Sequence, residues 1–200
     1  MTSGCKARIG VLGLLCLAPW PAGAQTGPWD LQTLLQQMAE VKSASASFTQ
    51  TQTSPLLSKP LTSTGVLSYK APDYLVKVTL APIHETFILD HQRITISGGP
   101  HDQTQVFNVT DAPQISGLIG GIQAVLSGNE TTLKQLYIVR LDGSRSAWEL
   151  QLLPRSENVK KLVQSMTIYG DGRRLTRMKT ISPTGSVTNM LISETITLAH

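Results

Sequence analysis

The chain has 200 residues, a formal net charge of +4 at pH 7, two cysteines and few aromatic residues. The length suits one domain, and two cysteines are too few for a disulfide-rich scaffold. So small a net charge gives no reason to expect a nucleic-acid partner.

The first 24 residues are typical of a cleaved secretory signal peptide. Lys6 and Arg8 provide a positive segment, residues 9–18 form an apolar run, and Ala22-Gly23-Ala24 supplies small residues for cleavage. The run is too short to span a bilayer, so we predict that the chain does not span the membrane. Cleavage would remove both cysteines, and the mature chain, 25–200, would then contain no disulfide, thiolate metal site or cysteine nucleophile.

Residues 28–42 carry the first helical pattern. Pro28 suits the first position of a helix, and Asp30 would lie near the positive end of the helix dipole. Apolar residues recur at spacings of three and four and predict an amphipathic helix: Leu31, Leu34, Leu35, Met38 and Val41.

A second helix is predicted over residues 111–128, with Asp111 as its N-cap and an end near Gly128. Gly117, Gly120 and Gly121 lie inside it, and each costs about 1 kcal/mol of helix stability relative to alanine. Some compensating interaction is therefore expected.

The rest of the mature chain is predicted to be antiparallel β-structure. Turn signals such as Asp142-Gly143 and Asp171-Gly172 separate runs rich in Val, Ile and Thr. The expected strands are 45–53, 64–70, 74–80, 84–90, 92–97, 103–109, 135–141, 146–153, 162–169, 173–181 and 186–198. A sheet of about 10–11 such strands would curl, and the two helices are the natural cover for its concave apolar side.

Several short motifs follow one another in an order that resembles the LolA family of periplasmic lipoprotein carriers. After the first helix come SASFTQ at 45–50 and G-x-L-x-Y-K-x-P-x-x-L at 65–75, and W-x-L-x-L-x-P follows at 148–154. The resemblance extends over nearly the whole mature chain and is to a divergent branch of the family. It implies an incomplete antiparallel β-barrel closed by two or three helices, with an apolar interior that holds acyl chains.

The resemblance also implies a function and partners. The chain would be a periplasmic carrier, without a cofactor, that shields the acyl chains of a lipoprotein or another lipid cargo and moves them from an inner-membrane exporter to an outer-membrane acceptor. We expect a monomer with no enzymatic activity. The residues expected to line the lipid-binding cavity are Leu34, Met38, Phe48, Leu67, Leu75, Leu118, Ile119 and Ile122. The glycines at 117, 120 and 121 could make the second helix a thin, adaptable lid, or close packing alone could require them.

One position departs from the family pattern. Members of the LolA family typically carry an arginine before the proline at this point and use it in cargo transfer, whereas Ala71 precedes Pro72 here. Lys70 would point to the opposite face of its strand and is a poor substitute. This difference leaves room for another lipid or a lipid-linked pigment precursor as cargo, or for a periplasmic lipid sensor or adaptor built on the same half-barrel.

A hydrolase or a metal enzyme is the alternative from another class. His84-Glu85 and Asp90-His91 pair an imidazole with a carboxylate, but adjacent residues on a strand face opposite ways. The chain has neither G-x-S-x-G nor H-E-x-x-H. We therefore expect no catalytic site, no metal site and no turnover of ester or peptide substrates.

Overall fold

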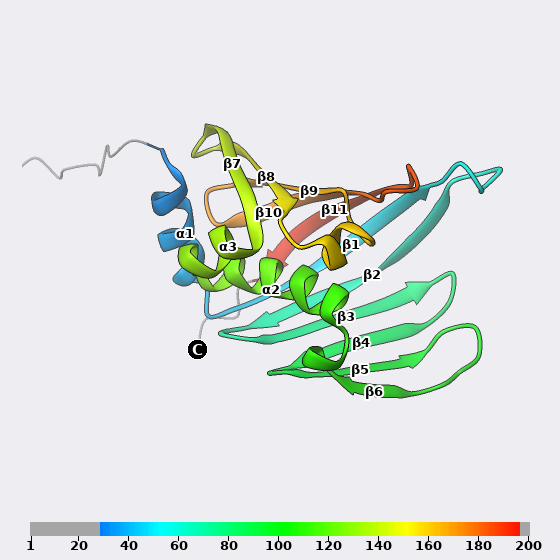
Figure 1. Cartoon of the computed structure of the whole chain (residues 1–200). Coiled ribbons are helices and arrows are strands. Elements are labelled where there is room, and N and C mark those ends of the chain that lie inside the picture. Colours follow the sequence, from blue (N-terminus) through cyan, green and yellow to red (C-terminus); the bar gives the residue numbers. More distant parts are fainter. Residues whose placement is uncertain (1–28, 197–200) are drawn as a thin grey trace, which may run out of the picture.

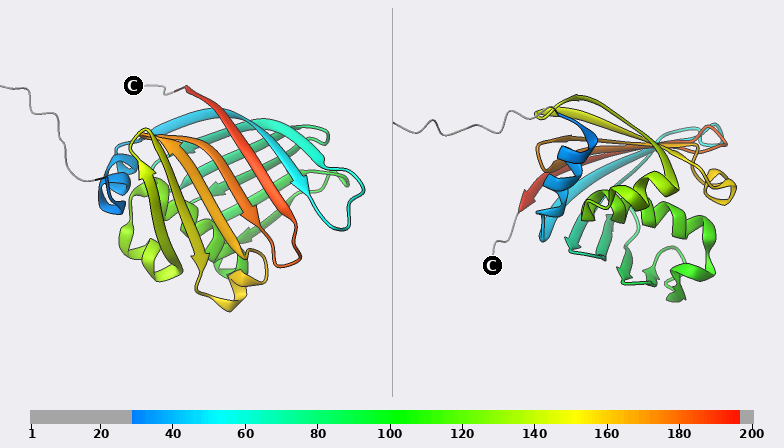
Figure 2. Two further views of the ribbon diagram at one scale, coloured as in Figure 1. Left: turned by 90° about the horizontal axis from the view of Figure 1, so that it is seen from above. Right: turned by 60° about the vertical axis from the view of Figure 1, so that its left-hand side comes forward.

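Eleven antiparallel strands form one curved sheet in the computed structural model, which describes residues 29–196 (Figures 1 and 2). The strands are β1 (Ser43–Thr53), β2 (Leu61–Lys70), β3 (Tyr74–Ala81), β4 (Glu85–Asp90), β5 (Arg93–Gly98), β6 (Gln105–Asn108), β7 (Tyr137–Ser144), β8 (Ala147–Pro154), β9 (Ser165–Asp171), β10 (Arg174–Ile181) and β11 (Val187–Ile196). Each corresponds to a strand predicted from the sequence. The predicted signal peptide, both cysteines, Pro28 and the predicted end of the last strand lie outside the described residues.

Two meanders make up the sheet and meet at its middle. The strand order is β6-β5-β4-β3-β2-β1-β11-β10-β9-β8-β7, so the last strand pairs with the first. β6 and β7 are the edge strands and, within residues 29–196, do not pair with each other. The fold is therefore an open antiparallel sheet, as predicted, and the helices that connect β6 to β7 lie on its concave side (Figure 2).

The first helix, α1 (Leu31–Ala39), is shorter than the predicted range of 28–42. Asp30 is its N-cap, because the carboxylate accepts a hydrogen bond of 2.8 Å from the Thr33 backbone N–H. This bond lowers the pKa of Asp30. The helix ends with Glu40 as its C-cap, so Val41 belongs to the connection to β1.

The second helix, α2 (Pro113–Ser127), starts later than predicted. Its N-cap is Ala112, and the expected cap, Asp111, instead ends a short 3-10 helix, η1 (Val109–Asp111). There the Asp111 carboxylate accepts a hydrogen bond of 3.3 Å from the backbone N–H of Asn108, the residue before η1, and does not cap α2. The predicted end is confirmed, because Gly128 caps the helix with a φ of 72°.

Two further helices did not emerge from the sequence pattern. α3 (Glu130–Leu136) is only two turns long and begins at Asn129, whose side chain accepts from the Thr132 N–H at 3.0 Å. α4 (Glu157–Lys160) is a single turn. Neither is long enough to show a clear 3.6-residue period, and α3 occupies the first two positions of a predicted strand that begins only at Tyr137. None of the helices described is long and apolar enough to cross a membrane.

The helices pack on the sheet through two separate clusters of buried residues. The larger cluster joins α1, α2 and α3 to β8 and β9, and Trp148, Leu150 and Leu152 of β8 are at most 2% exposed. The smaller cluster joins Ile119 of α2 to β4 and β5. The long helix α2 therefore rests on both halves of the sheet and bridges the middle strands (Figure 1).

Candidate functional site

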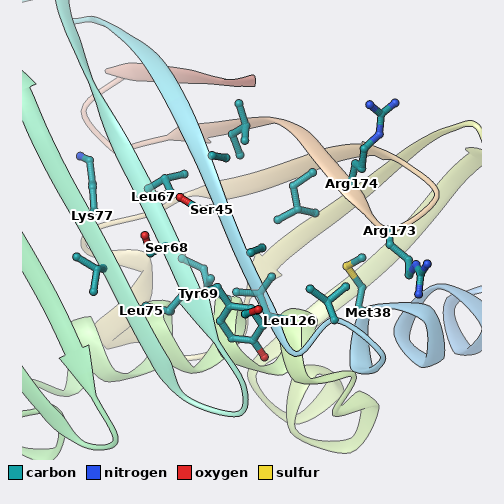
Figure 3. A pocket seen from close by; sticks show the side chains of 18 of the residues that line it. Met38, Ser45, Leu67, Ser68, Tyr69, Leu75, Lys77, Leu126, Arg173 and Arg174 are labelled. Atoms are coloured by element: carbon teal, nitrogen blue, oxygen red, sulfur yellow. The ribbon is translucent and has the colours of Figure 1, made fainter. Parts of the chain in front are cut away.

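An apolar cavity of about 670 Å³ lies under this bridge. Its walls come from strands β1, β2, β3, β4, β10 and β11, and its cover comes from α1 and α2 (Figure 3). Apolar side chains that line it include Met38, Leu67, Leu75, Ile122, Leu126 and Met190.

The first half of β1 explains why this space is not filled. The segment SASAS at 43–47 contains only small side chains, and Ala44 and Ala46 lie opposite Tyr69 and Leu67 of β2. A protein interior normally packs to the density of an organic crystal, so small residues at adjacent positions leave room that their neighbours do not close. The cavity is thus encoded by the short side chains of β1 as much as by its apolar walls.

Four of the eight predicted lining residues border the cavity: Met38, Leu67, Leu75 and Ile122. The other four lie elsewhere. Leu34 and Leu118 belong to the larger cluster, Ile119 to the smaller one, and Phe48 is 2% exposed with its ring against Gly65. Lipid binding by any of the eight stays a prediction.

Two of the three glycines of α2, Gly117 and Gly121, face neighbouring side chains at very short range. A Cβ atom at Gly117 would lie 2.2 Å from Val159 Cγ2, and one at Gly121 would lie 2.3 Å from Tyr137 Cε2. The Tyr137 hydroxyl donates to the Gly117 carbonyl at 3.1 Å, and burial raises the pKa of Tyr137 to about 12. These contacts support the close-packing explanation, whereas the lid role stays a prediction.

Gly121→Ala should therefore destabilise the protein. We expect a loss of about 1–2 kcal/mol, because the clash with the buried Tyr137 ring outweighs the helix propensity that alanine adds. Gly120→Ala is the matched control: its Cβ would meet only the flexible end of Leu136, at 3.1 Å, so stability should stay unchanged or rise. Urea unfolding of both variants measures the difference. A stability gain in Gly121→Ala would remove the packing explanation and favour the adaptable lid.

None of the polar residues of the lining was predicted, and two of them, Tyr69 and Lys77, are withdrawn from solvent. Tyr69 is 6% exposed, and its hydroxyl has no hydrogen-bond partner among the described residues. Burial, followed by the negative charge of Asp73, raises the pKa of Tyr69. Lys77 is half-buried on β3, and burial lowers the pKa of its amine. The signal in the sequence was a lysine on the same strand face as Leu75.

Tyr69→Phe should raise the stability of the protein by about 1 kcal/mol, because it removes a buried hydroxyl that has no partner among the described residues. Tyr74→Phe, on the neighbouring strand, is the control; that side chain is 37% exposed, and its hydroxyl deletion should have little effect. Thermal or urea unfolding checks both values. A loss of stability in Tyr69→Phe would mean that the hydroxyl does have a hydrogen-bond partner.

The histidines of both imidazole–carboxylate pairs are exposed. His91 is paired with Asp90 at 2.8 Å on the exposed β4–β5 turn, and this hydrogen bond raises the pKa of His91. His84 is exposed in the loop before β4. Over residues 29–196, no three His, Cys, Asp or Glu residues gather as a metal site would require.

Ala71, where the family pattern has an arginine, lies in the turn between β2 and β3. Its backbone N–H donates to the Lys42 carbonyl at 2.8 Å. Lys70 is exposed at the end of β2, opposite Ser43 and Tyr74. Neither side chain is among the residues that line the cavity.

A curved antiparallel sheet with an apolar cavity under a helical cover defines a class of protein that binds hydrophobic ligands. Comparison with known families identifies the particular one. The profile described as "Outer membrane lipoprotein carrier protein LolA-like" matches residues 23–199. The chain therefore belongs to the LolA-like family of outer membrane lipoprotein carrier proteins, a family of carriers.

Individual relatives are distant. An outer-membrane lipoprotein carrier protein of Methylibium petroleiphilum is 26% identical over 183 residues, which cover 92% of this chain and 84% of the relative. A LolA superfamily protein of Nitrosomonas europaea is 12% identical, with a TM-score of 0.46 over 84% of this chain and 93% of that one. The lipoprotein LppX of Mycobacterium tuberculosis is also 12% identical, with a TM-score of 0.45 over 85% of this chain and 94% of that one.

Proposed function

We propose that this chain is a periplasmic carrier that shields acyl chains in its cavity and moves them from the inner to the outer membrane. The observation that carries the proposal is the apolar cavity between the middle strands and α2. Membership of a lipoprotein carrier family supports it, as does the name of the Methylibium relative. Its partners would be an inner-membrane exporter and an outer-membrane acceptor, each met transiently.

The energetics explain why such a cavity is needed. Each methylene group exposed to water costs about 0.8 kcal/mol, so a palmitoyl chain costs on the order of 12 kcal/mol. A carrier must offset most of this penalty during transit. It must also bind the acyl chain less favourably than the receiving membrane does, because otherwise the chain would not be released. A preformed cavity that is partly open to solvent meets both needs better than a closed and tightly packed core.

The cavity is large enough for at least one long acyl chain. A methylene group takes up roughly the volume of a liquid water molecule, ~30 Å³. A cavity of 670 Å³ then accommodates at least about 20 methylene groups. Ala71, which stands in place of the family arginine, makes a carrier of a non-lipoprotein lipid the second candidate.

Purification from the native periplasm followed by mass spectrometry of the bound material tests the proposal. We expect an acylated molecule to co-purify in near-stoichiometric amount, and delipidated protein to take up a fluorescent fatty acid. A protein that carries no lipid and takes up no acyl probe would contradict a carrier function. An acylated peptide in the bound fraction would select the lipoprotein, and a free lipid would select the second candidate.

A further inference from the structure

One wall of the cavity carries a lysine among apolar residues. Lys77 lies opposite Leu67 of β2 and Phe87 of β4, and all three line the cavity. Because opposed residues in an antiparallel sheet share a face, Lys77 belongs to the concave side. Figure 3 shows it beside Leu67, with Arg173 and Arg174 at the other end of the cavity.

The surroundings of the Lys77 amine compensate its charge only in part. The nitrogen lies 5.3 Å from the centre of the Phe48 ring and donates to Gln50 Oε1 at a long 3.3 Å. Neither group is charged. Glu85, on β4, attracts the amine from beyond ion-pair distance, and no carboxylate of the described chain forms an ion pair with it.

This arrangement is unfavourable in the empty protein. A charged group withdrawn from water loses hydration free energy, and only an opposite charge or strong hydrogen bonds restore it. Burial is the main cause of the lowered pKa of Lys77, so the neighbouring groups do not fully replace the hydration free energy that the amine loses. A ligand with anionic oxygens would supply the missing partner through a charge-assisted hydrogen bond.

The other basic residues of the lining are different. Arg173 and Arg174 each form an ion pair with a carboxylate, and Lys42 is exposed and donates to a backbone carbonyl. An anion at that end of the cavity would stay hydrated and would gain little. Lys77 is therefore the position in the lining where an anion gains most from binding.

We propose that the cargo is an acyl-chain amphiphile whose anionic head group, a carboxylate or a phosphate, enters the cavity and binds the Lys77 amine. The inference rests on the proposed carrier function and narrows its cargo. With its head group inside, the cargo differs from a lipoprotein, whose polypeptide must stay outside. Leu67 and Phe87 flank the lysine and provide the apolar surface on which the chain lies.

Competition binding with chain-matched ligands tests the inference. Delipidated protein is loaded with a fluorescent acyl probe and titrated with palmitate, hexadecyl phosphate, hexadecanol and methyl palmitate, all below their aggregation concentrations. We expect palmitate or hexadecyl phosphate to bind at least about tenfold more tightly than the two neutral ligands. The better of the two anions identifies the source of the head group.

Variants assign this preference to the lysine. Lys77→Met and Lys77→Gln should abolish the preference while hexadecanol still binds, and Lys77→Arg should retain it. Lys70→Met, which removes an exposed charge at the end of β2, should bind like the wild type. Urea unfolding identifies the variants that are folded, and Lys77→Gln serves if Lys77→Met is not.

Two different results would overturn the inference. Equal affinity of the wild type for palmitate and hexadecanol, or an anion preference that survives in Lys77→Met, refutes the role of Lys77 but leaves a carrier of acyl chains intact. Failure of the delipidated protein to take up the acyl probe at all would refute the carrier function itself, and the inference with it.

Discussion

Gly65→Ala should cost at least about 3 kcal/mol of stability, the upper end of the range for overpacked interiors. A Cβ atom at Gly65 would lie 1.9 Å from the Val78 carbonyl oxygen and 2.8 Å from Phe48 Cε1. The first contact is with backbone, which cannot rotate away. The register between β2 and β3 shifts between Thr64 and Gly65, a typical place for a glycine in a strand.

Urea unfolding followed by tryptophan fluorescence measures this loss, with Thr64→Ala as the matched control. Thr64 is the preceding residue of β2 and is exposed, so its replacement should change the free energy of unfolding by no more than about 0.5 kcal/mol. If Gly65→Ala were as stable as the control, the approach of Phe48 and β3 to this glycine would be looser than the structure has it.

The same contact shows what the motifs encode. Phe48 of SASFTQ lies directly opposite Gly65, the first residue of G-x-L-x-Y, and its ring covers the space where a side chain would be. The two motifs are thus the two halves of one cross-strand contact. This is a structural reason for the occurrence of both motifs in the chain. It also explains why the Phe48 ring packs over Gly65 and does not line the cavity.

Periodicity and turn residues were sufficient to predict the sheet from the sequence. Alternation in Trp148, Leu150 and Leu152 predicted the buried face of β8, and Asp171-Gly172 predicted the turn between β9 and β10. The helix starts were predicted less well, because a cap depends on which donor a side chain reaches. Asp30 reaches the Thr33 N–H and caps α1, whereas Asp111 reaches back to Asn108.

The candidate site was harder to predict, because a cavity is space that side chains leave unfilled, and a sequence pattern does not show that space. The pattern that selects Leu34 and Met38 for one helix face does not distinguish a filled space from an empty one, and only Met38 borders the cavity. Lys77 was overlooked because strand β3 is apolar on both faces, so alternation alone does not say which face is concave. The small residues of SASAS were the available signal for the cavity, and they were used only as part of a motif.

The position of the cavity has a consequence for cargo release. α2 is held by the larger cluster through Leu118, Ala124 and Val125, and by the smaller cluster through Ile119. The smaller cluster contains three buried residues and therefore less apolar area to separate. If α2 moves to admit a larger cargo or to release one, its contact with the smaller cluster should separate first.

Ala46→Trp should abolish binding of acyl chains with little loss of stability. Ala46 is 9% exposed, lies opposite Leu67 and borders the cavity, so an indole at this position would occupy the space that a chain needs. We expect the affinity for a fluorescent fatty acid to fall at least about 100-fold, which corresponds to 2.7 kcal/mol. The indole enters existing space, so the usual penalty of overpacking should be small.

Thr49→Trp is the matched control, because Thr49 is exposed on the other face of the same strand. That variant introduces the same side chain but should bind the probe like the wild type. Probe binding and urea unfolding are measured on both proteins. If Ala46→Trp is folded and still binds the probe with unchanged affinity, the acyl chain of the probe binds outside this cavity. The exposed apolar side chains of Leu56 and Leu61, near the β1–β2 loop, are one such place. If only the control binds, the space above Ala46 is where the cargo lies.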